Sequence, residues 1–186
     1  MELFSGLLSA LGLSGAAGLN AYIPLLIVGA LDHFGFMHLG APFDIISNPY
    51  FMVLVGLLGV LDFVGDKIPG VDHALHVAGT VINTGAGAVL AASQMGVADV
   101  PPAVSAVLGL LVAGGVHATR SALRPVSTAT TAGLGNPVIS AAEDAGSLTL
   151  SVLAVFAPLL AVLGLAGFGV LAFKLYNRVR PRRQRI

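Results

Sequence analysis

The polar chemistry of this sequence is concentrated between His117 and Asp144, a stretch that lies between two strongly apolar segments. It holds two arginines, Arg120 and Arg124, and the adjacent carboxylates of Glu143 and Asp144. Guanidinium groups bind phosphate and carboxylate groups, whereas carboxylates can bind protons and cations. A charge at the centre of a membrane helix costs about 2.5–3.5 kcal/mol on insertion scales. Charges in such surroundings therefore predict a polar site inside a membrane protein.

Two further groups of residues could contribute to this site. His117 lies close to Arg120 in sequence, and Asn136 precedes Pro137 at a predicted helix start, where backbone N–H groups favour anions. Asp62 and Asp66 are four residues apart, so their carboxylates share one helix face. These carboxylates could bind a cation, relay protons or pair with basic residues. We expect a substrate to be bound by His117, Arg120, Arg124 and Asn136. We expect protons or cations to be coupled by the carboxylates of Asp62, Asp66, Glu143 and Asp144.

Composition sets the class of protein. The chain has 186 residues, of which 56% are hydrophobic and 10% charged, and its mean hydropathy is +0.92. A soluble domain has about 25% charged residues, so these values predict an all-α, polytopic transmembrane bundle. Six of the nine basic residues lie between positions 174 and 186, which favours a cytoplasmic C-terminus. We predict one transmembrane domain, 1–176, followed by a basic cytoplasmic tail, 177–186.

The first apolar stretch, Leu3–Leu31, is uncharged and long enough to cross a bilayer. Inside it, Pro24 cannot donate a hydrogen bond to the carbonyl of Asn20. This predicts either a tolerated kink or a broken helix that lines a polar cavity, with Asn20 as a substrate-binding residue. A second break is predicted at Gly133–Pro137.

The remaining apolar stretches complete a bundle of about six spans. The predicted spans are 49–64, 72–95 and 103–121. The uncharged stretch Ala145–Phe173 is either one long, tilted helix or the end of a fifth span and all of a sixth, with a turn near Pro158, and the loop charges favour six spans. Five spans with a re-entrant segment at 126–144 are the alternative.

The residue types also bound the cofactor chemistry. The chain has no cysteine, which excludes disulfides and thiolate metal sites. Asp72 and His76 are four residues apart and could supply two metal ligands, but the further ligands of a site are missing. We expect no metal and no cofactor. The basic tail suits a membrane surface, so nucleic acid is not an expected partner.

Four motifs together are similar to a known family. They are G-A-A-G-L-N-A-Y-I-P-L-L at 15–26, D-K-I-P-G-V-D at 66–72, A-L-R-P at 122–125 and G-L-G-N-P-V-I-S-A-A-E-D at 133–144. This set resembles a bacterial integral-membrane family, the domain of unknown function 4126 family. The resemblance covers nearly the whole chain and implies a small multi-span protein of the bacterial inner membrane. It implies no reaction and no substrate.

The sequence supports three functional hypotheses. The first is a small transporter or channel-like protein for a small anionic solute or lipid headgroup, assembled as a homo-oligomer in the lipid bilayer. The second is an enzyme acting on a lipid phosphate, with His117 as general base, but no nucleophile motif accompanies it. The third is a membrane scaffold or assembly protein whose polar residues only join helices. Ionisable residues within the apolar body favour the first, so we do not expect an enzyme.

Overall fold

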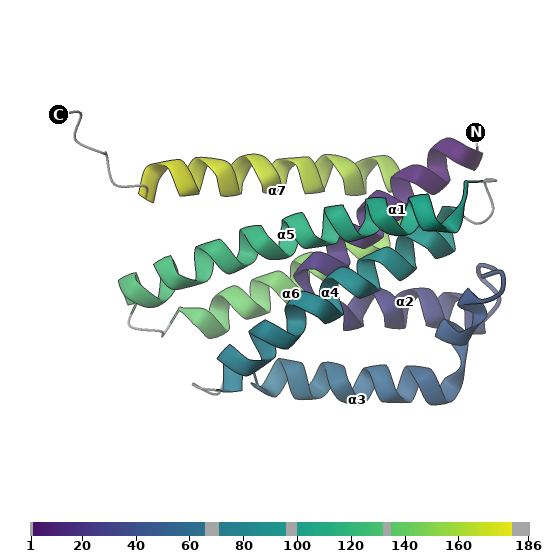
Figure 1. The fold of residues 1–186 in the computed structure, drawn as a ribbon, viewed down its shortest axis with the longest axis horizontal. Coiled ribbons are helices and arrows are strands. Elements are labelled where there is room, and N and C mark those ends of the chain that lie inside the picture. The colour runs from purple at the N-terminus through teal and green to yellow at the C-terminus, as the bar shows by residue number, and fades with distance from the viewer. Residues whose placement is uncertain (1, 66–70, 96–99, 132–134, 180–186) are drawn as a thin grey trace.

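The computed structural model describes residues 2–65, 71–95, 100–131 and 135–179, and this part of the chain is helical without strands. The all-α prediction is confirmed (Figure 1). Seven α-helices and one short 3-10 helix are described: α1 (Glu2–Leu19), α2 (Tyr22–His33), η1 (Phe43–Ser47), α3 (Pro49–Gly65), α4 (Val71–Met95), α5 (Pro102–Thr131), α6 (Asn136–Phe156) and α7 (Pro158–Val179).

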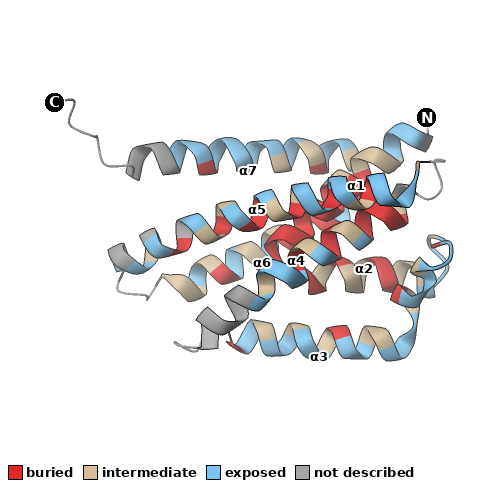
Figure 2. Cartoon of the chain, viewed as in Figure 1, coloured by how far each residue is buried: buried red, intermediate tan, exposed pale blue. Residues whose placement is uncertain are grey.

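Helix α1 is the centre of the bundle. It packs against α4, α5, α6 and α7, and its residues from Gly12 onward are buried (Figure 2). Small residues make this close packing possible. A Cβ added at Gly12 would lie 2.8 Å from that of Ala154, and one added at Gly18 would lie 2.6 Å from the carbonyl oxygen of Ala113. The glycines of α1 therefore let four neighbouring helices approach one central helix.

The chain reverses direction at Asn20, directly after α1. The first turns of α1 lie beside the end of α4, since Gly6 approaches the carbonyl oxygen of Gln94. Helix α2 leads back to the same end of the bundle, where Gly29 packs against the carbonyl oxygen of Ile46 in η1 (Figure 1). The predicted break near Asn20–Pro24 is thus confirmed. The prediction that Leu3–Leu31 makes one crossing is wrong, because the break turns the chain back inside the bundle.

Helices α3 to α7 run back and forth between the two ends of the bundle (Figure 1). Helix α6 ends at Phe156 and α7 begins at Pro158, as the predicted turn requires. The predicted helix end near Ser121 is wrong, because α5 continues through Pro125 to Thr131. Serine and threonine hydroxyls along this extension donate hydrogen bonds to backbone carbonyls. The hydroxyl of Thr128, for example, donates to the carbonyl of Arg124. The second predicted break, Gly133–Pro137, coincides with the interval between α5 and α6, and residues 132–134 lie outside the described part.

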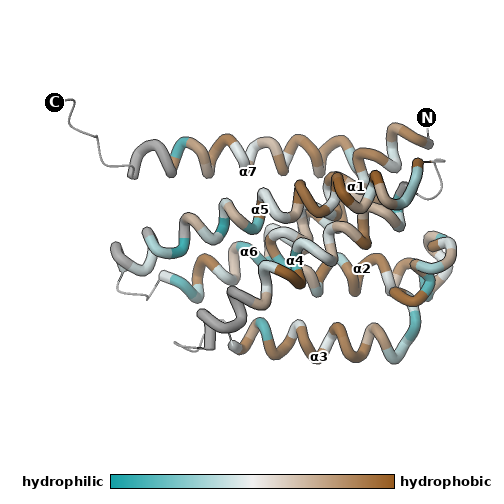
Figure 3. The backbone as a smooth tube through the Cα atoms, in the orientation of Figure 1, coloured by the Kyte–Doolittle hydropathy of each residue, from teal (hydrophilic) through white to brown (hydrophobic). Residues whose placement is uncertain are grey.

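The outer surface is apolar, as a membrane protein requires. Three of the described helices are long and apolar enough to cross a membrane: Pro102–Ala122, Asn136–Phe156 and Pro158–Leu175. Leucine, valine and phenylalanine side chains are exposed along α3 and α7, and both helices are largely brown in Figure 3. The hydrophilic residues of α5 and α6 lie mainly toward the end of the bundle that holds the last turns of α5 and the first turns of α6 (Figure 3).

Candidate functional site

The helix break at Asn20 exposes backbone groups that side chains from three other helices satisfy. The guanidinium of Arg120 donates to the carbonyl of Leu19. The hydroxyl of Ser147 is shared between the carbonyls of Ala16, at 3.0 Å, and Asn20, at 3.1 Å. On the other side of the break, the N–H of Ala21 donates to Oδ1 of Asn83 over 3.3 Å. Buried backbone groups need such partners, so the break is a specified feature of the fold.

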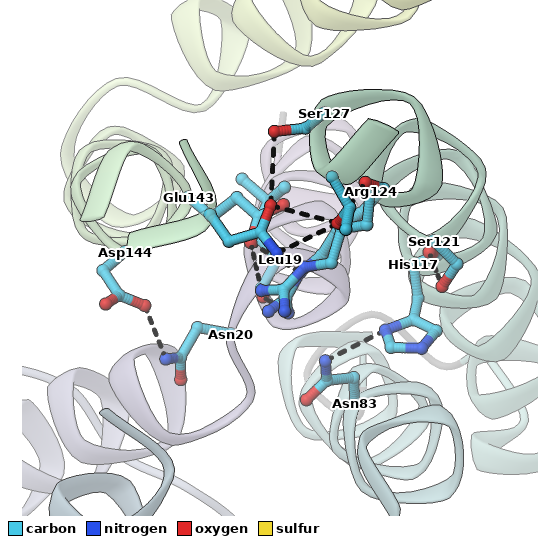
Figure 4. A network of polar contacts seen from close by, with 12 residues as sticks. Leu19, Asn20, Asn83, His117, Ser121, Arg124, Ser127, Glu143 and Asp144 are labelled. Atoms are coloured by element: carbon cyan, nitrogen blue, oxygen red, sulfur yellow. Dashed lines mark hydrogen bonds and ion pairs between the residues drawn. The ribbon is translucent and has the colours of Figure 1, made fainter. Parts of the chain in front are cut away.

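Asn20 itself bridges the break. Its Oδ1 accepts a hydrogen bond from the N–H of Tyr22 at 2.9 Å, and its Nδ2 donates to Oδ1 of Asp144 at 2.8 Å. The amide therefore caps the start of α2 and attaches it to α6 (Figure 4). Helix α2 has 12 residues and is about 18 Å long. With its far end at a membrane surface, the break would lie deep inside a hydrocarbon layer of about 30 Å.

Two arginines converge on one carboxylate oxygen beside the break. Oε2 of Glu143 lies 2.6 Å from Nε of Arg120. The same oxygen lies 3.1 Å from Nη2 of Arg124, and Figure 4 labels Glu143 and Arg124. The three side chains are only 8–11% exposed. We call Arg120, Arg124 and Glu143 the arginine clamp. It joins α5 to α6, and through Arg120 it also holds the carbonyl end of α1, where a cation is favoured by the helix dipole.

His117 extends the polar core toward α4. Because Oδ1 of Asn83 accepts the N–H of Ala21, Nδ2 of Asn83 faces the imidazole and donates to Nδ1 of His117 at 3.2 Å. The ring proton then sits on Nε2, which lies 3.2 Å from the hydroxyl of Thr80. His117 is 3% exposed. It therefore connects α4 and α5 at the level of the break.

The structure brings five of the predicted site residues together: Asn20, Arg120, Arg124, Glu143 and Asp144. His117 joins them through Asn83. These residues come from the break between α1 and α2, from α5 and from α6, so the site depends on the tertiary fold.

The other predicted site residues lie elsewhere. Asn136 is seven residues before Glu143, about 10 Å along α6, and its amide hydrogen-bonds to Ser127 and Thr128 at the end of α5. Asp62 is half-buried on α3, which packs on α2, η1 and α4. Asp66 lies outside the described residues, as do the side chains of Asp72 and His76. Among the described residues no group of three potential metal ligands is found.

Sequence reasoning did not identify Ser147, Thr80 or Asn83 as residues of the polar core. A signal for Ser147 was present, because a residue three or four positions after Glu143 and Asp144 shares their helix face. The role of Asn83 could be inferred only from the packing of α4 beside the break, which the sequence does not give.

An apolar helical bundle with a polar core around a broken helix defines this chain as an integral membrane protein. Residues 7–178 match the family described as domain of unknown function (DUF4126), and the chain belongs to that family. The resemblance inferred from the four sequence motifs is confirmed by this match. No curated protein and no solved structure matches the chain.

Proposed function

We propose that this protein is a small membrane transporter or channel-like protein that handles a small anionic solute or lipid headgroup. The observation that carries the proposal is the arginine clamp beside a helix break inside the bundle. Transporters use broken helices of this kind at their substrate sites, because the free backbone groups and nearby charges can bind ions and polar substrates. Ionisable side chains within membrane helices are costly and generally mark a pathway or a binding site.

Glu143 supports the anionic nature of the substrate. Its carboxylate occupies the space between two guanidinium groups, and guanidinium binds carboxylate and phosphate in the same fork geometry. An anionic group that enters the clamp would take the place of Glu143. The released carboxylate would bind a proton or cation, and Asp144, Asp62 and Asp66 are the further candidates for this coupling.

The membrane orientation follows from the basic residues. Positive residues favour the cytoplasmic side, so the end of the bundle that holds the C-terminal turn of α7 would face the cytoplasm. We place the protein in the bacterial inner membrane, with the tail at 177–186 inside the cell. A bundle of this size encloses little space on its own, so we propose a homo-oligomer.

The test is anion flux through purified protein in proteoliposomes, with inorganic phosphate and succinate as the probes. The wild type should give currents with at least one of them in electrophysiology on supported membranes. Arg124→Ala should reduce these currents at least tenfold, because the clamp loses one guanidinium. Lys174→Ala is the matched control, since Lys174 is an exposed cation on α7 outside the clamp. Normal flux by folded Arg124→Ala protein would contradict the proposal.

A scaffold or assembly role is the second candidate, and the burial of the clamp favours it. Arg120, Arg124 and Glu143 pair with one another and are about nine-tenths buried, as side chains that only join helices would be. In that case Arg124→Ala would lower the thermal stability, and neither the wild type nor the variant would carry either anion.

A further inference from the structure

A pocket of about 430 Å³ lies between α2, α3 and α6 and includes both Asn20 and Asp144 in its wall. This volume lies within the range of about 300–1,000 Å³ that is usual for ligand sites. Its other walls are apolar and come from Tyr22, Ile23 and Leu26 of α2, Gly59 and Phe63 of α3, and Leu148 of α6. The pocket therefore has one polar wall and an apolar remainder, which suits an amphiphile.

One carboxylate oxygen of the polar wall lacks a hydrogen-bond donor. Oδ1 of Asp144 accepts from Nδ2 of Asn20, but Oδ2 is buried and has no hydrogen-bond partner among the described residues. Nearly all buried polar atoms in proteins have a partner, so an acceptor of this kind indicates a missing donor. Because the acceptor belongs to a carboxylate, a positively charged donor complements it best.

The apolar walls reach the surface of the bundle. Val60 and Phe63 on α3 and Leu148 on α6 line the pocket, and all three are exposed. On a membrane-embedded bundle, exposed side chains of this kind contact acyl chains. Asp144 lies eight residues after the start of α6, which is about 12 Å. The headgroup layer on each side of a bilayer is about 5–7 Å thick. With the start of α6 at the membrane surface, Asp144 would lie about 5–7 Å below that layer, so the headgroup has to enter the pocket to this depth.

We propose that this pocket binds a membrane lipid whose headgroup carries a primary ammonium. The ammonium donates a hydrogen bond to Oδ2 of Asp144, and an acyl chain lies along the apolar walls of α3 and α6. This inference goes beyond the proposed transport of an anion. The pocket shares Asn20 and Asp144 with the candidate functional site, but its ligand is cationic and does not enter the arginine clamp. The inference holds equally for a transporter and for a scaffold.

The test compares two lipids with identical acyl chains on delipidated, purified protein by native mass spectrometry. Phosphatidylethanolamine carries a primary ammonium, whereas the quaternary ammonium of phosphatidylcholine has no N–H donor. We expect the wild type to bind the ethanolamine lipid at least tenfold more tightly than the choline lipid. Asp144→Asn should reduce this preference, because the amide keeps the shape of the side chain and removes its charge.

A second variant fills the pocket without disturbing the fold. Gly56 lines the pocket, and a Cβ added there meets no atom within 4 Å. Gly56→Leu should therefore fold and lose the preference for the ethanolamine lipid. Gly85→Leu on α4 is the matched control, because Gly85 is exposed and equally open but lies outside the pocket. It should keep the preference.

Three results would overturn the proposal. The first is equal binding of the two lipids by the wild type, and the second is an unchanged preference in Gly56→Leu. The third is a dimer that Gly56→Leu abolishes and that lipid does not affect, because the pocket would then be covered by a second copy of the chain.

Discussion

Replacing Glu143 tests whether its carboxylate holds the two arginines of the clamp inside the bundle. Oε2 lies 2.6 Å from Nε of Arg120 and 3.1 Å from Nη2 of Arg124. Glu143→Ala would remove the anion shared by both guanidinium groups and leave two like charges facing each other. The change should therefore lower the free energy of unfolding by more than the loss of an exposed ion pair would.

The magnitude follows from the burial of the three side chains, which are 8%, 10% and 11% exposed. Removing one partner of a buried ion pair costs about 3–5 kcal/mol. The remaining exposure of about a tenth lets solvent screen part of this cost, so we expect the lower end, about 3 kcal/mol. For a chain of this size that corresponds to a decrease in Tm of roughly 6–12 °C. Glu143→Gln keeps an acceptor oxygen and should cost about 1–2 kcal/mol.

The assay is reversible unfolding in mixed detergent micelles, followed by circular dichroism, for a double-mutant cycle of Glu143→Ala and Arg124→Ala. The double variant should lose less free energy of unfolding than the two single variants lose together, by at least about 1.5 kcal/mol. A loss below about 0.5 kcal/mol for Glu143→Ala, within the range of ordinary surface substitutions, would refute the reasoning. It would mean that the arginines do not depend on this carboxylate.

Two further predictions concern the packing and the break. Gly87→Ala should destabilise the protein by about 1–3 kcal/mol, because the added methyl overlaps α5. Gly85→Ala, at an open position, should leave the stability unchanged. Thermal unfolding measures both variants, and equal Tm values would contradict the described packing. Ser147→Ala should cost about 1–3 kcal/mol in the same unfolding assay, because the carbonyl of Asn20 loses its hydroxyl partner; an unchanged stability would show that this carbonyl has another donor.

The break itself was predictable from the sequence, because its cause is local. Pro24 has no N–H for the carbonyl of Asn20, and this is true in whatever fold surrounds it. The partners were not predictable in the same way. Ser147 is 127 positions from Asn20, and only the packing of α6 on α1 brings the two together. A local cause is visible in one sequence, whereas a distant partner is not.

The direction of the chain after the break could not be inferred from apolar length. Leu3–Leu31 is long enough for one crossing, and its hydropathy does not distinguish a crossing from two shorter helices that return to the same side. The arginine clamp was easier to predict in part, since charges are rare in apolar surroundings. Its residues were identified, but the sharing of one Glu143 oxygen depends on how α5 lies beside α6.

For the proposed transport, the polar core around the break has to open to water and to an anion. Ser140 lies one turn before Glu143 on α6 and is 1% exposed, and the chain has no cysteine of its own. The most direct measurement is labelling of the Ser140→Cys variant in membranes by a charged, water-soluble thiol reagent, with exposed Thr131→Cys as control. Both variants should react, and phosphate or succinate should slow only the reaction of Ser140→Cys. Labelling of Thr131→Cys without any labelling of folded Ser140→Cys would contradict the proposed transport.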